Sequence, residues 1–346
     1  MQKKEIFTNF KGIVDSTLRE GLQFHKTNFS FTDQIQVLMY LNEVGVGRAE
    51  VGNPTVPAQF VIIKKLVEQS NRPLLIAHIR NRLADIQAAI LTGVEGVNIL
   101  CTVDPERLAG MKISLEEYKQ VLAEVIALAK EHHLEVKVGI EDFFGQNQAD
   151  AWQLLAVADQ LRVDRVSIAD TLGTAFPWQI EEQVQWLRAR VEADILVHLH
   201  NDLGMAQSNA IIALLNGANF VDTTILGIGE RTGINSLSML LSSLYVLNGQ
   251  FVLDQYDLSL LTIIDNWLAD SLDISVPFSA VTNQQTAFNH RAGIHINAIT
   301  RFGPKKYEPF APGVIGNTRN IEVGGLISGG TTDFEVQQFY QQHGKQ

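Results

Sequence analysis

The chain has 346 residues, of which 46% are hydrophobic, and a formal net charge of −11. This composition indicates a globular protein, and the acidic charge argues against sequence-independent binding to nucleic acid or anionic membranes, which requires a basic surface. The single cysteine, Cys101, cannot form an internal disulfide, and residues 1–10 lack the apolar core of a signal peptide. We therefore expect a cytoplasmic protein that binds neither nucleic acid nor membrane.

Short apolar, β-branched segments alternate with longer amphipathic segments along most of the chain. The predicted strands are residues 13–17, 48–52, 74–79, 96–101, 135–142, 165–170, 195–200 and 220–227. Helical patterns lie between them, such as residues 31–45, where Thr32 or Asp33 is the predicted N-cap and Gly45 the stop. Apolar strands that alternate with helices predict a parallel sheet, and eight such units predict a (β/α)8 TIM barrel rather than a doubly wound sheet.

The predicted barrel occupies residues 1–245, and residues 246–346 form a small C-terminal appendage of helices and loops. Within this appendage, residues 253–272 have a helical pattern, and the chain is rich in loops from about residue 275. The last stretch, residues 331–346, is predicted to form a final helix.

Polar residues gather where the predicted strands end. The residues concerned are Arg19, Glu20, Glu50, Asn53, His78, Arg80, Glu141, Asp142, Asp170, Thr171, His198, His200, Asn201 and Asp202. The eighth strand leads into the loop GIGERTG, and only the fourth, with Cys101 and Thr102, lacks such groups. Because (β/α)8 enzymes carry their active sites at the carboxyl ends of the strands, this pattern indicates an enzyme.

The pair His198 and His200 predicts a metal site. In a strand, residues two apart point to the same side, so the two imidazoles can share one ion. A carboxylate from the first strand would complete the set, either Glu20, which we prefer, or Asp15, which lies deeper in the barrel. Two imidazoles and one carboxylate bind a divalent ion such as Mn²⁺, Mg²⁺ or Zn²⁺ and leave positions open for substrate.

Four separated motifs carry a family resemblance: DSTLREGLQF (15–24), HLHND (198–202), GIGERTG (227–233) and HRAGIH (290–295). Together they resemble the acyl-CoA Claisen-condensing metalloenzymes, namely homocitrate, 2-isopropylmalate and citramalate synthases and the related HMG-CoA lyase. The resemblance covers roughly residues 10–325. It implies an acyltransferase that condenses acetyl-CoA with a 2-oxo acid, after which water hydrolyses the thioester to release CoA and a 2-hydroxy di- or tricarboxylic acid.

The resemblance also implies roles for individual residues. Glu20, His198 and His200 resemble the metal ligands, Arg19 resembles the arginine that stabilises the developing oxyanion, and Gln23 matches a substrate-pocket position. Further candidates are Glu141 for catalysis, His295 and Tyr307 for catalysis in the neighbouring subunit, and Gly229, Glu230 and Arg231 for acetyl-CoA binding or site support. A homodimer with exchanged C-terminal segments is therefore expected. The base that removes the methyl proton of acetyl-CoA is not assigned.

The choice of 2-oxo acid depends on a few positions. Glu20, the segment IAHIRNRLADIQAAILTGVEGVNIL (76–100) and Ile234 are similar to homocitrate synthases, in which His78 and Thr171 would help to bind the distal carboxylate of 2-oxoglutarate. The segment KVGIED departs from that pattern, because Lys137, Gly139 and Ile140 stand where arginine and two serines are usual. Lysine keeps a positive charge but lacks the bidentate fork of arginine.

We therefore expect a homocitrate synthase-like enzyme that uses 2-oxoglutarate, with 2-isopropylmalate or citramalate synthase as the alternative. A second alternative is HMG-CoA lyase-like retro-aldol cleavage, although Cys101 does not lie in the glycine-rich loop where those lyases carry their cysteine. A non-catalytic scaffold protein is a third, against which the intact set Arg19, Glu20, His198 and His200 argues.

Overall fold

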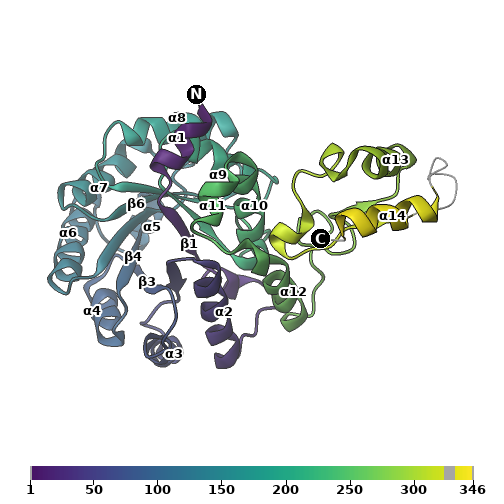
Figure 1. Ribbon diagram of the computed structural model, residues 1–346. Helices are drawn as coiled ribbons and strands as arrows, with labels where there is room; N and C mark the ends of the chain where they lie inside the picture. The colour runs from purple at the N-terminus through teal and green to yellow at the C-terminus, as the bar shows by residue number, and fades with distance from the viewer. Residues whose placement is uncertain (1, 323–331, 345–346) are drawn as a thin grey trace. The chain divides into compact units, whose positions relative to one another are not determined.

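The computed structural model describes residues 2–322 and 332–344, and its first unit contains a closed barrel of eight parallel strands (Figure 1). The strands are β1 (Gly12–Asp15), β2 (Arg48–Val51), β3 (Leu74–Arg80), β4 (Gly96–Cys101), β5 (Glu135–Ile140), β6 (Arg165–Asp170), β7 (Asp194–Leu199) and β8 (Phe220–Thr223). Each pairs with the next along the chain, and β8 pairs with β1, where Gly12 lies opposite Phe220. The predicted (β/α)8 barrel is confirmed.

Helices alternate with these strands and surround them in Figure 1. They are α1 (Gln2–Asn9), α2 (Phe31–Val44), α3 (Pro57–Val67), α4 (Leu83–Thr92), α5 (Pro105–Gly110), α6 (Leu115–Glu131), α7 (Gln148–Gln160), α8 (Pro177–Arg188) and α9 (Ala206–Leu215), with 3₁₀ turns at Gly21–Gln23 and Ile225–Gly227. Most strand residues are buried, because the barrel interior covers one face and the helices cover the other.

Helix α2 shows how local sequence sets these boundaries. Its N-cap is Ser30, whose hydroxyl accepts from the backbone N–H of Asp33, while the Asp33 carboxylate accepts from the N–H of Ser30. The predicted N-cap, Thr32 or Asp33, was wrong because this reciprocal capping box places Asp33 at the third helical position. Gly45 ends the helix with φ = 100°, as predicted, because glycine adopts this left-handed conformation without steric cost.

Charged groups and an aromatic ring fill the amino-terminal end of the barrel. Glu135 binds Arg48 through both carboxylate oxygens, with Nε–Oε1 and Nη2–Oε2 distances of 2.8 Å, and also pairs with Arg165. The guanidinium carbons of Arg48 and Arg165 lie 5.4 and 5.0 Å from the ring centroid of Phe220. Above them Leu196 packs against Phe220 and Val14. Because these side chains fill the amino-terminal end of the barrel, we expect the active site at the carboxyl ends of the strands.

Strand β8 ends at Thr223, four residues earlier than predicted. The chain turns there because Thr224 pairs with Ser236, and Leu226 and Gly227 follow with positive φ angles of 59° and 72°. The GIGERTG loop is therefore folded back at the mouth of the barrel and does not extend the strand.

The second unit comprises residues 238–346, so the division falls at the start of α10 (Leu237–Leu247), ahead of the predicted boundary at residue 245. Its elements are α11 (Gly249–Leu253), α12 (Leu261–Ser271), β9 (Asn289–His290), α13 (Gly293–Phe302), β10 (Asn320–Ile321) and α14 (Asp333–His343), with 3₁₀ turns at Leu258–Leu260, Pro304–Lys306 and Pro312–Ile315. A small core of Ile296, Ile299, Ile321, Val336 and Phe339 holds α13, β10 and α14 together.

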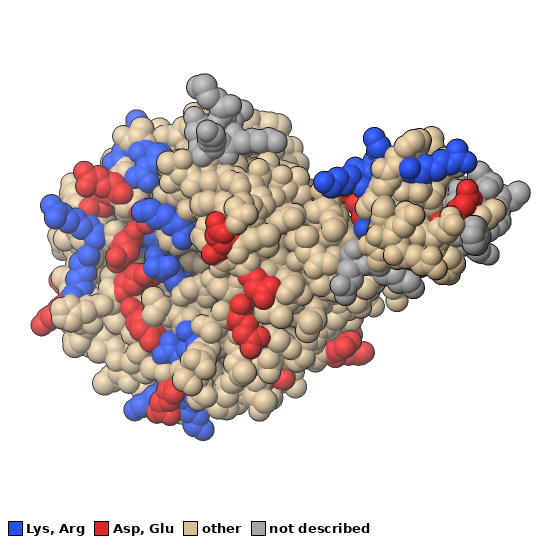
Figure 2. All heavy atoms as spheres, viewed as in Figure 1, with Lys and Arg blue, Asp and Glu red and all other residues tan. Residues whose placement is uncertain are grey.

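Within the described residues, no helix is long and apolar enough to cross a membrane. On the face of the first unit seen in Figure 2, lysine and arginine side chains are interspersed with aspartate and glutamate.

Candidate active site

A cavity of about 360 Å³ opens at the carboxyl ends of the barrel strands. Most of the predicted site residues line it: Arg19, Glu20, Gln23, His78, Lys137, Glu141, Thr171, His198, His200, Glu230 and Arg231. They come from segments far apart in the sequence, and the closed barrel brings them together.

Glu20, His198 and His200 form the candidate metal centre. One potential ligand atom from each lies within 4.8 Å of the other two, and Nε2 of His198 is 3.9 Å from Oε2 of Glu20. The two imidazole rings lie on the same side of the chain with centroids 5.1 Å apart. All three side chains are almost completely buried, so the cluster faces the cavity rather than bulk water.

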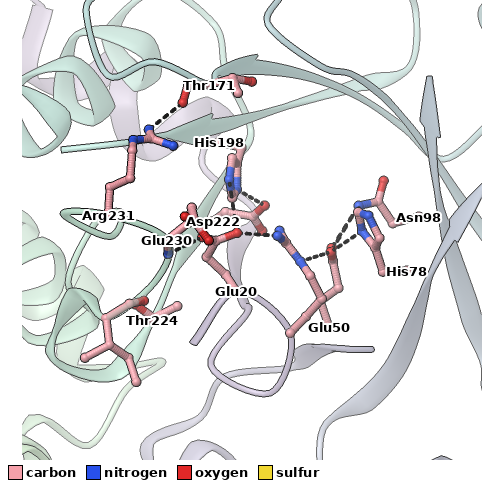
Figure 3. Close-up of polar contacts among 12 residues, drawn as sticks. Glu20, Glu50, His78, Asn98, Thr171, His198, Asp222, Thr224, Glu230 and Arg231 are labelled. Atoms are coloured by element: carbon pink, nitrogen blue, oxygen red, sulfur yellow. Dashed lines mark hydrogen bonds and ion pairs between the residues drawn. The ribbon is translucent and has the colours of Figure 1, made fainter. Parts of the chain in front are cut away.

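The histidines are in states suited to metal binding. Nδ1 of His198 lies 2.9 Å from the Asp222 carboxylate, which fixes that nitrogen as the donor and leaves Nε2 free as a ligand (Figure 3). Burial, together with the neighbouring His198, lowers the pKa of His200 to about 4, so the ring is neutral at pH 7. Nδ1 of His200 is buried and has no hydrogen-bond partner among the residues that the structure describes. These donors fit a divalent ion.

Glu20 is held in its ionised form. Burial alone would raise its pKa, but Arg19, His198 and the backbone N–H of Glu230 lower it below the usual value. The Glu230 N–H donates to Oε1 of Glu20 over 2.8 Å, so the GIGERTG loop supports the candidate ligand through its backbone. This approach requires glycine at position 229, where a Cβ atom would lie 2.8 Å from the same oxygen.

Asp15, the alternative carboxylate, does not join the metal cluster. It is completely buried below the cavity and accepts from the backbone N–H of Thr17 and the hydroxyl of Thr223. Burial raises its pKa to about 7 despite these hydrogen bonds. The geometry therefore favours Glu20, which lies beside both imidazoles.

Arg19 lies between two carboxylates at the base of the cavity. Its Nε donates to Oε1 of Glu50 over 2.8 Å, and Nη1 pairs with Glu20. Glu50 is fully buried and also contacts His78 and Asn98 (Figure 3). Burial would raise the pKa of Glu50, but Lys137 and Arg19 hold it well below its ordinary range. The guanidinium is thus fixed next to the candidate metal ligand.

Lys137 takes part in the same buried network. Its Nζ lies 2.9 Å from Oε2 of Glu50 and 3.5 Å from Oδ2 of Asp222, and only 1% of its side chain is exposed. In this cluster two cations, Arg19 and Lys137, face three carboxylates, Glu20, Glu50 and Asp222. The excess of buried negative charge is a second reason why a divalent cation fits here.

Lys137→Met is expected to lower the free energy of unfolding by about 3–5 kcal/mol, because it leaves the Glu50 and Asp222 carboxylates buried with less compensating charge. The matched control is Lys11→Met, which removes an ion pair between a half-exposed lysine and Asp194 and should cost at most about 1 kcal/mol. Denaturant unfolding of both variants measures the difference. Equal losses in the two variants would contradict the structural role of Lys137.

The mouth of the cavity carries further predicted residues. Glu141 pairs with Arg107 of α5, and Arg231 binds both carboxylate oxygens of Asp202 and the backbone carbonyl of Thr171. The Thr171 hydroxyl accepts from the backbone N–H of Asp142, so its own hydrogen remains available to donate.

His295 and Tyr307 belong to the second unit, where their rings stack with centroids 3.8 Å apart and planes 20° from parallel. Nearby within that unit, Glu308 binds Arg319 and lies 3.2 Å from Nε2 of His290. The contribution of His295 and Tyr307 to a neighbouring subunit's site stays a prediction.

Sequence reasoning did not assign roles to Asn98, Ser167 and Asp222, which line the cavity, or to Glu50, which anchors its base. A signal for three of them was present, because Glu50, Asn98 and Ser167 each lie between two apolar residues of a strand, where a polar side chain needs a partner in the barrel interior.

The chain is similar in sequence to a known enzyme family. Residues 11–267 match the family model HMGL-like, and residues 282–342 match the model described as homocitrate synthase post-HMGL domain-like. The chain is 35% identical over 319 residues to mitochondrial homocitrate synthase of Schizosaccharomyces pombe, covering 92% of this chain and 76% of the relative. It is 32% identical to homocitrate synthase of Pyrococcus abyssi, and the match covers 94% of this chain and 90% of that relative.

Solved structures give the same fold at lower sequence identity. Hydroxymethylglutaryl-CoA lyase from Pseudomonas aeruginosa is 20% identical, with a TM-score of 0.66 over 78% of this chain and 95% of the lyase. At this identity the likeness supports the barrel fold alone.

Proposed function

Because the chain belongs to the HMGL-like family and groups within it with the homocitrate synthases, it is a condensing acyltransferase, and we propose that it joins acetyl-CoA to 2-oxoglutarate. The observation that carries the proposal is the convergence of Glu20, His198 and His200 beside Arg19 at the mouth of the barrel. A scaffold protein would have no need of this buried, charged arrangement.

Glu20, His198 and His200 would hold a divalent ion, which supplies a Lewis acid for the keto group of the 2-oxo acid. Asp222 orients His198 through Nδ1, and Glu230 orients Glu20 through its backbone N–H. Arg19 supplies a fixed positive charge for the oxyanion that develops when the acetyl methyl carbon attacks the keto carbon. Glu141, at the cavity wall, is our candidate for proton transfer, and its pairing with Arg107 orients it.

For 2-oxoglutarate, the distal carboxylate must meet hydrogen-bond donors in the cavity wall. His78, Lys137 and Thr171 all line the cavity, and the Thr171 hydroxyl hydrogen is available to donate. The homology to homocitrate synthases extends through both matched regions of the chain, which supports the same assignment.

One observation favours a second candidate, a 2-oxo acid with an apolar tail of the kind used by 2-isopropylmalate or citramalate synthases. Lys137 is already paired with Glu50 and Asp222, and the cavity wall near it includes Leu100, Ile140 and Ala169. Gly139 also lines the cavity, where a Cβ atom would lie 3.3 Å from Oδ1 of Asn98. A tail without charge would need no partner there.

The test is CoA release by the Mn²⁺-loaded protein with acetyl-CoA and, in separate reactions, 2-oxoglutarate, 2-oxoisovalerate or pyruvate. The proposal predicts the highest kcat/KM with 2-oxoglutarate. A higher kcat/KM with 2-oxoisovalerate or pyruvate would replace it with the second candidate. Cleavage of a hydroxyacyl-CoA without CoA release would indicate the lyase reaction instead.

The predicted homodimer, in which His295 and Tyr307 would enter the site of the other subunit, belongs to the same proposal. The same proposal includes contact between acetyl-CoA and the GIGERTG loop. Arg231 in this loop is accessible to a ligand, because 39% of its side chain is exposed.

A further inference from the structure

Three ionisable side chains of the second unit form a buried cluster, and we call His290, Glu308 and Arg319 the buried ionic cluster. The Arg319 guanidinium binds both carboxylate oxygens of Glu308, with 2.7 Å from Nη2 to Oε2, and Nε2 of His290 lies 3.2 Å from Oε1. All three residues are almost completely buried. Burial would raise the pKa of Glu308, but Arg319 and His290 hold it below its ordinary value, so the carboxylate is ionised at pH 7.

Stability alone does not account for this cluster. Taking an ion pair out of water costs several kcal/mol per ion, and apolar side chains of similar size often give equal or higher stability. What the pair adds is a defined geometry, because the planar guanidinium binds a carboxylate in one orientation. The segments that the cluster holds in place therefore indicate its role.

Glu308 anchors the segment that carries Tyr307. Among residues 300–311, all of which the structure describes, Glu308 is the only buried residue. Its neighbour Tyr307 is exposed, and the Tyr307 ring stacks on His295 with centroids 3.8 Å apart. The position of the Tyr307 ring therefore depends on where the Glu308 carboxylate is held.

The two partners of that carboxylate belong to the framework of the same unit. His290 is in β9 and pairs with Ile321 of β10, and Arg319 directly precedes β10. Nη1 of Arg319 also donates to the backbone carbonyl of Gly344 over 3.0 Å, at the end of α14. The cluster thus joins the Tyr307 segment to β9, β10 and α14.

His295, the other member of the stacked pair, is attached to the same framework. Helix α13 begins at Gly293, shortly after β9, and His295 lies in its first turn. Ile296 and Ile299 of the same helix pack in the small core with β10 and α14. Both rings of the stack are therefore tied to the same pair of strands, one through α13 and the other through the buried ionic cluster.

We propose that Glu308 is a positioning residue for the reaction and acts through Tyr307. Held by its two partners in the buried ionic cluster, Glu308 keeps the Tyr307 ring stacked on His295. The inference rests on the proposed function, in which Tyr307 and His295 complete the active site of the other subunit. Glu308 itself contacts neither substrate nor metal in this arrangement.

The first test compares wild type, Glu308→Asp and Glu322→Gln in steady-state condensation. Glu308→Asp keeps the negative charge for Arg319 but shortens the side chain by one methylene, which shifts the Tyr307 segment. A misplacement of about 1 Å can cost about a hundredfold in rate, so kcat should fall by about 10–100-fold, and both KM values should change less. Glu322→Gln is the control, because Glu322 follows β10 but is exposed, and its kcat should equal that of wild type.

A double-mutant cycle separates positioning from a general loss of structure. Tyr307→Phe removes the hydroxyl group and keeps the ring. Because Glu308 acts through Tyr307 in the proposal, adding Glu308→Asp to Tyr307→Phe should lower kcat by no more than about twofold further. Losses that multiply would overturn the proposal, and so would an unchanged kcat in Glu308→Asp alone.

A paired variant decides the question if the shorter carboxylate unfolds the unit. Glu308→Leu combined with Arg319→Met replaces the buried pair by apolar side chains and should keep the midpoint of thermal unfolding close to that of wild type. The proposal predicts that its kcat still falls by about 10–100-fold, since the defined geometry is lost. A folded paired variant with the kcat of wild type would show that the cluster only stabilises the unit.

Nuclear magnetic resonance tests the geometry without turnover. In protein labelled with isotope-enriched histidine, the Tyr307 ring shifts the signals of the His295 ring protons because it stacks on them. Glu308→Asp should change this shift, and Glu322→Gln should not. An unchanged shift in Glu308→Asp would overturn the proposal. A changed shift in a protein that condenses no 2-oxo acid would refute the proposed reaction and leave the positioning of Tyr307 by Glu308 supported.

Discussion

Loss of His200 is expected to lower kcat/KM by about a thousandfold or more, because a metal ion acting as a Lewis acid contributes several kcal/mol to the transition state. The His200→Ala variant removes one of the three groups of the candidate metal centre. Equilibrium dialysis with Mn²⁺ or Zn²⁺ should show a parallel loss of metal affinity. The measurement of affinity is independent of turnover, so it separates metal binding from catalysis.

Two further variants sharpen this test. Asp222→Asn keeps the shape of the side chain that contacts Nδ1 of His198 and should weaken metal binding by about 10–100-fold, as expected for a group that orients a ligand. His132→Ala, at the exposed end of α6, should leave metal affinity unchanged. If His200→Ala bound metal as tightly as wild type, the assignment of the centre would be wrong.

The second large effect is expected at Arg19. Arg19→Lys should lower kcat by about 10²–10³-fold, the cost typical of losing one preorganised oxyanion donor. Lysine keeps the charge, but it cannot reach Glu20 and Glu50 at once as the guanidinium does through Nη1 and Nε. KM for the 2-oxo acid should change less than kcat, because the missing interaction forms mainly in the transition state.

Arg48→Lys is the matched control for Arg19, because Arg48 is also bound to a glutamate but at the amino-terminal end of the barrel. It should lower thermal stability without changing kcat. If both variants lost kcat to a similar extent, the effect would come from a general loss of stability. A specific role of Arg19 would then be refuted.

The sequence predicted the barrel well because each strand of a closed parallel barrel is covered on both faces, which produces short apolar runs that can be read directly. The pairing of His198 and His200 in the candidate metal centre was predictable for a similar reason, since the period-two geometry of a strand places both on one side. The sequence also favoured Glu20 over Asp15, but the distance of each carboxylate from the imidazoles depends on how the chain turns after β1 and needed the structure.

The buried network below the candidate metal centre was less predictable. Whether Glu50, Asn98 and Asp222 point inward, and which groups they meet, depends on the register between neighbouring strands and on closure of the barrel. The same holds for Lys137, whose pairing with Glu50 crosses from β5 to β2.

The most direct test of the central claim is CoA release from acetyl-CoA and 2-oxoglutarate by the Mn²⁺-loaded protein, followed with a thiol reagent. The protein's own thiol does not interfere, because Cys101 is buried and burial raises its pKa to about 12. We predict that CoA release requires both substrates and stops when a chelator removes the metal. CoA release that is independent of the 2-oxo acid, or none with any 2-oxo acid despite bound metal, would contradict the assignment as a metal-dependent condensing enzyme.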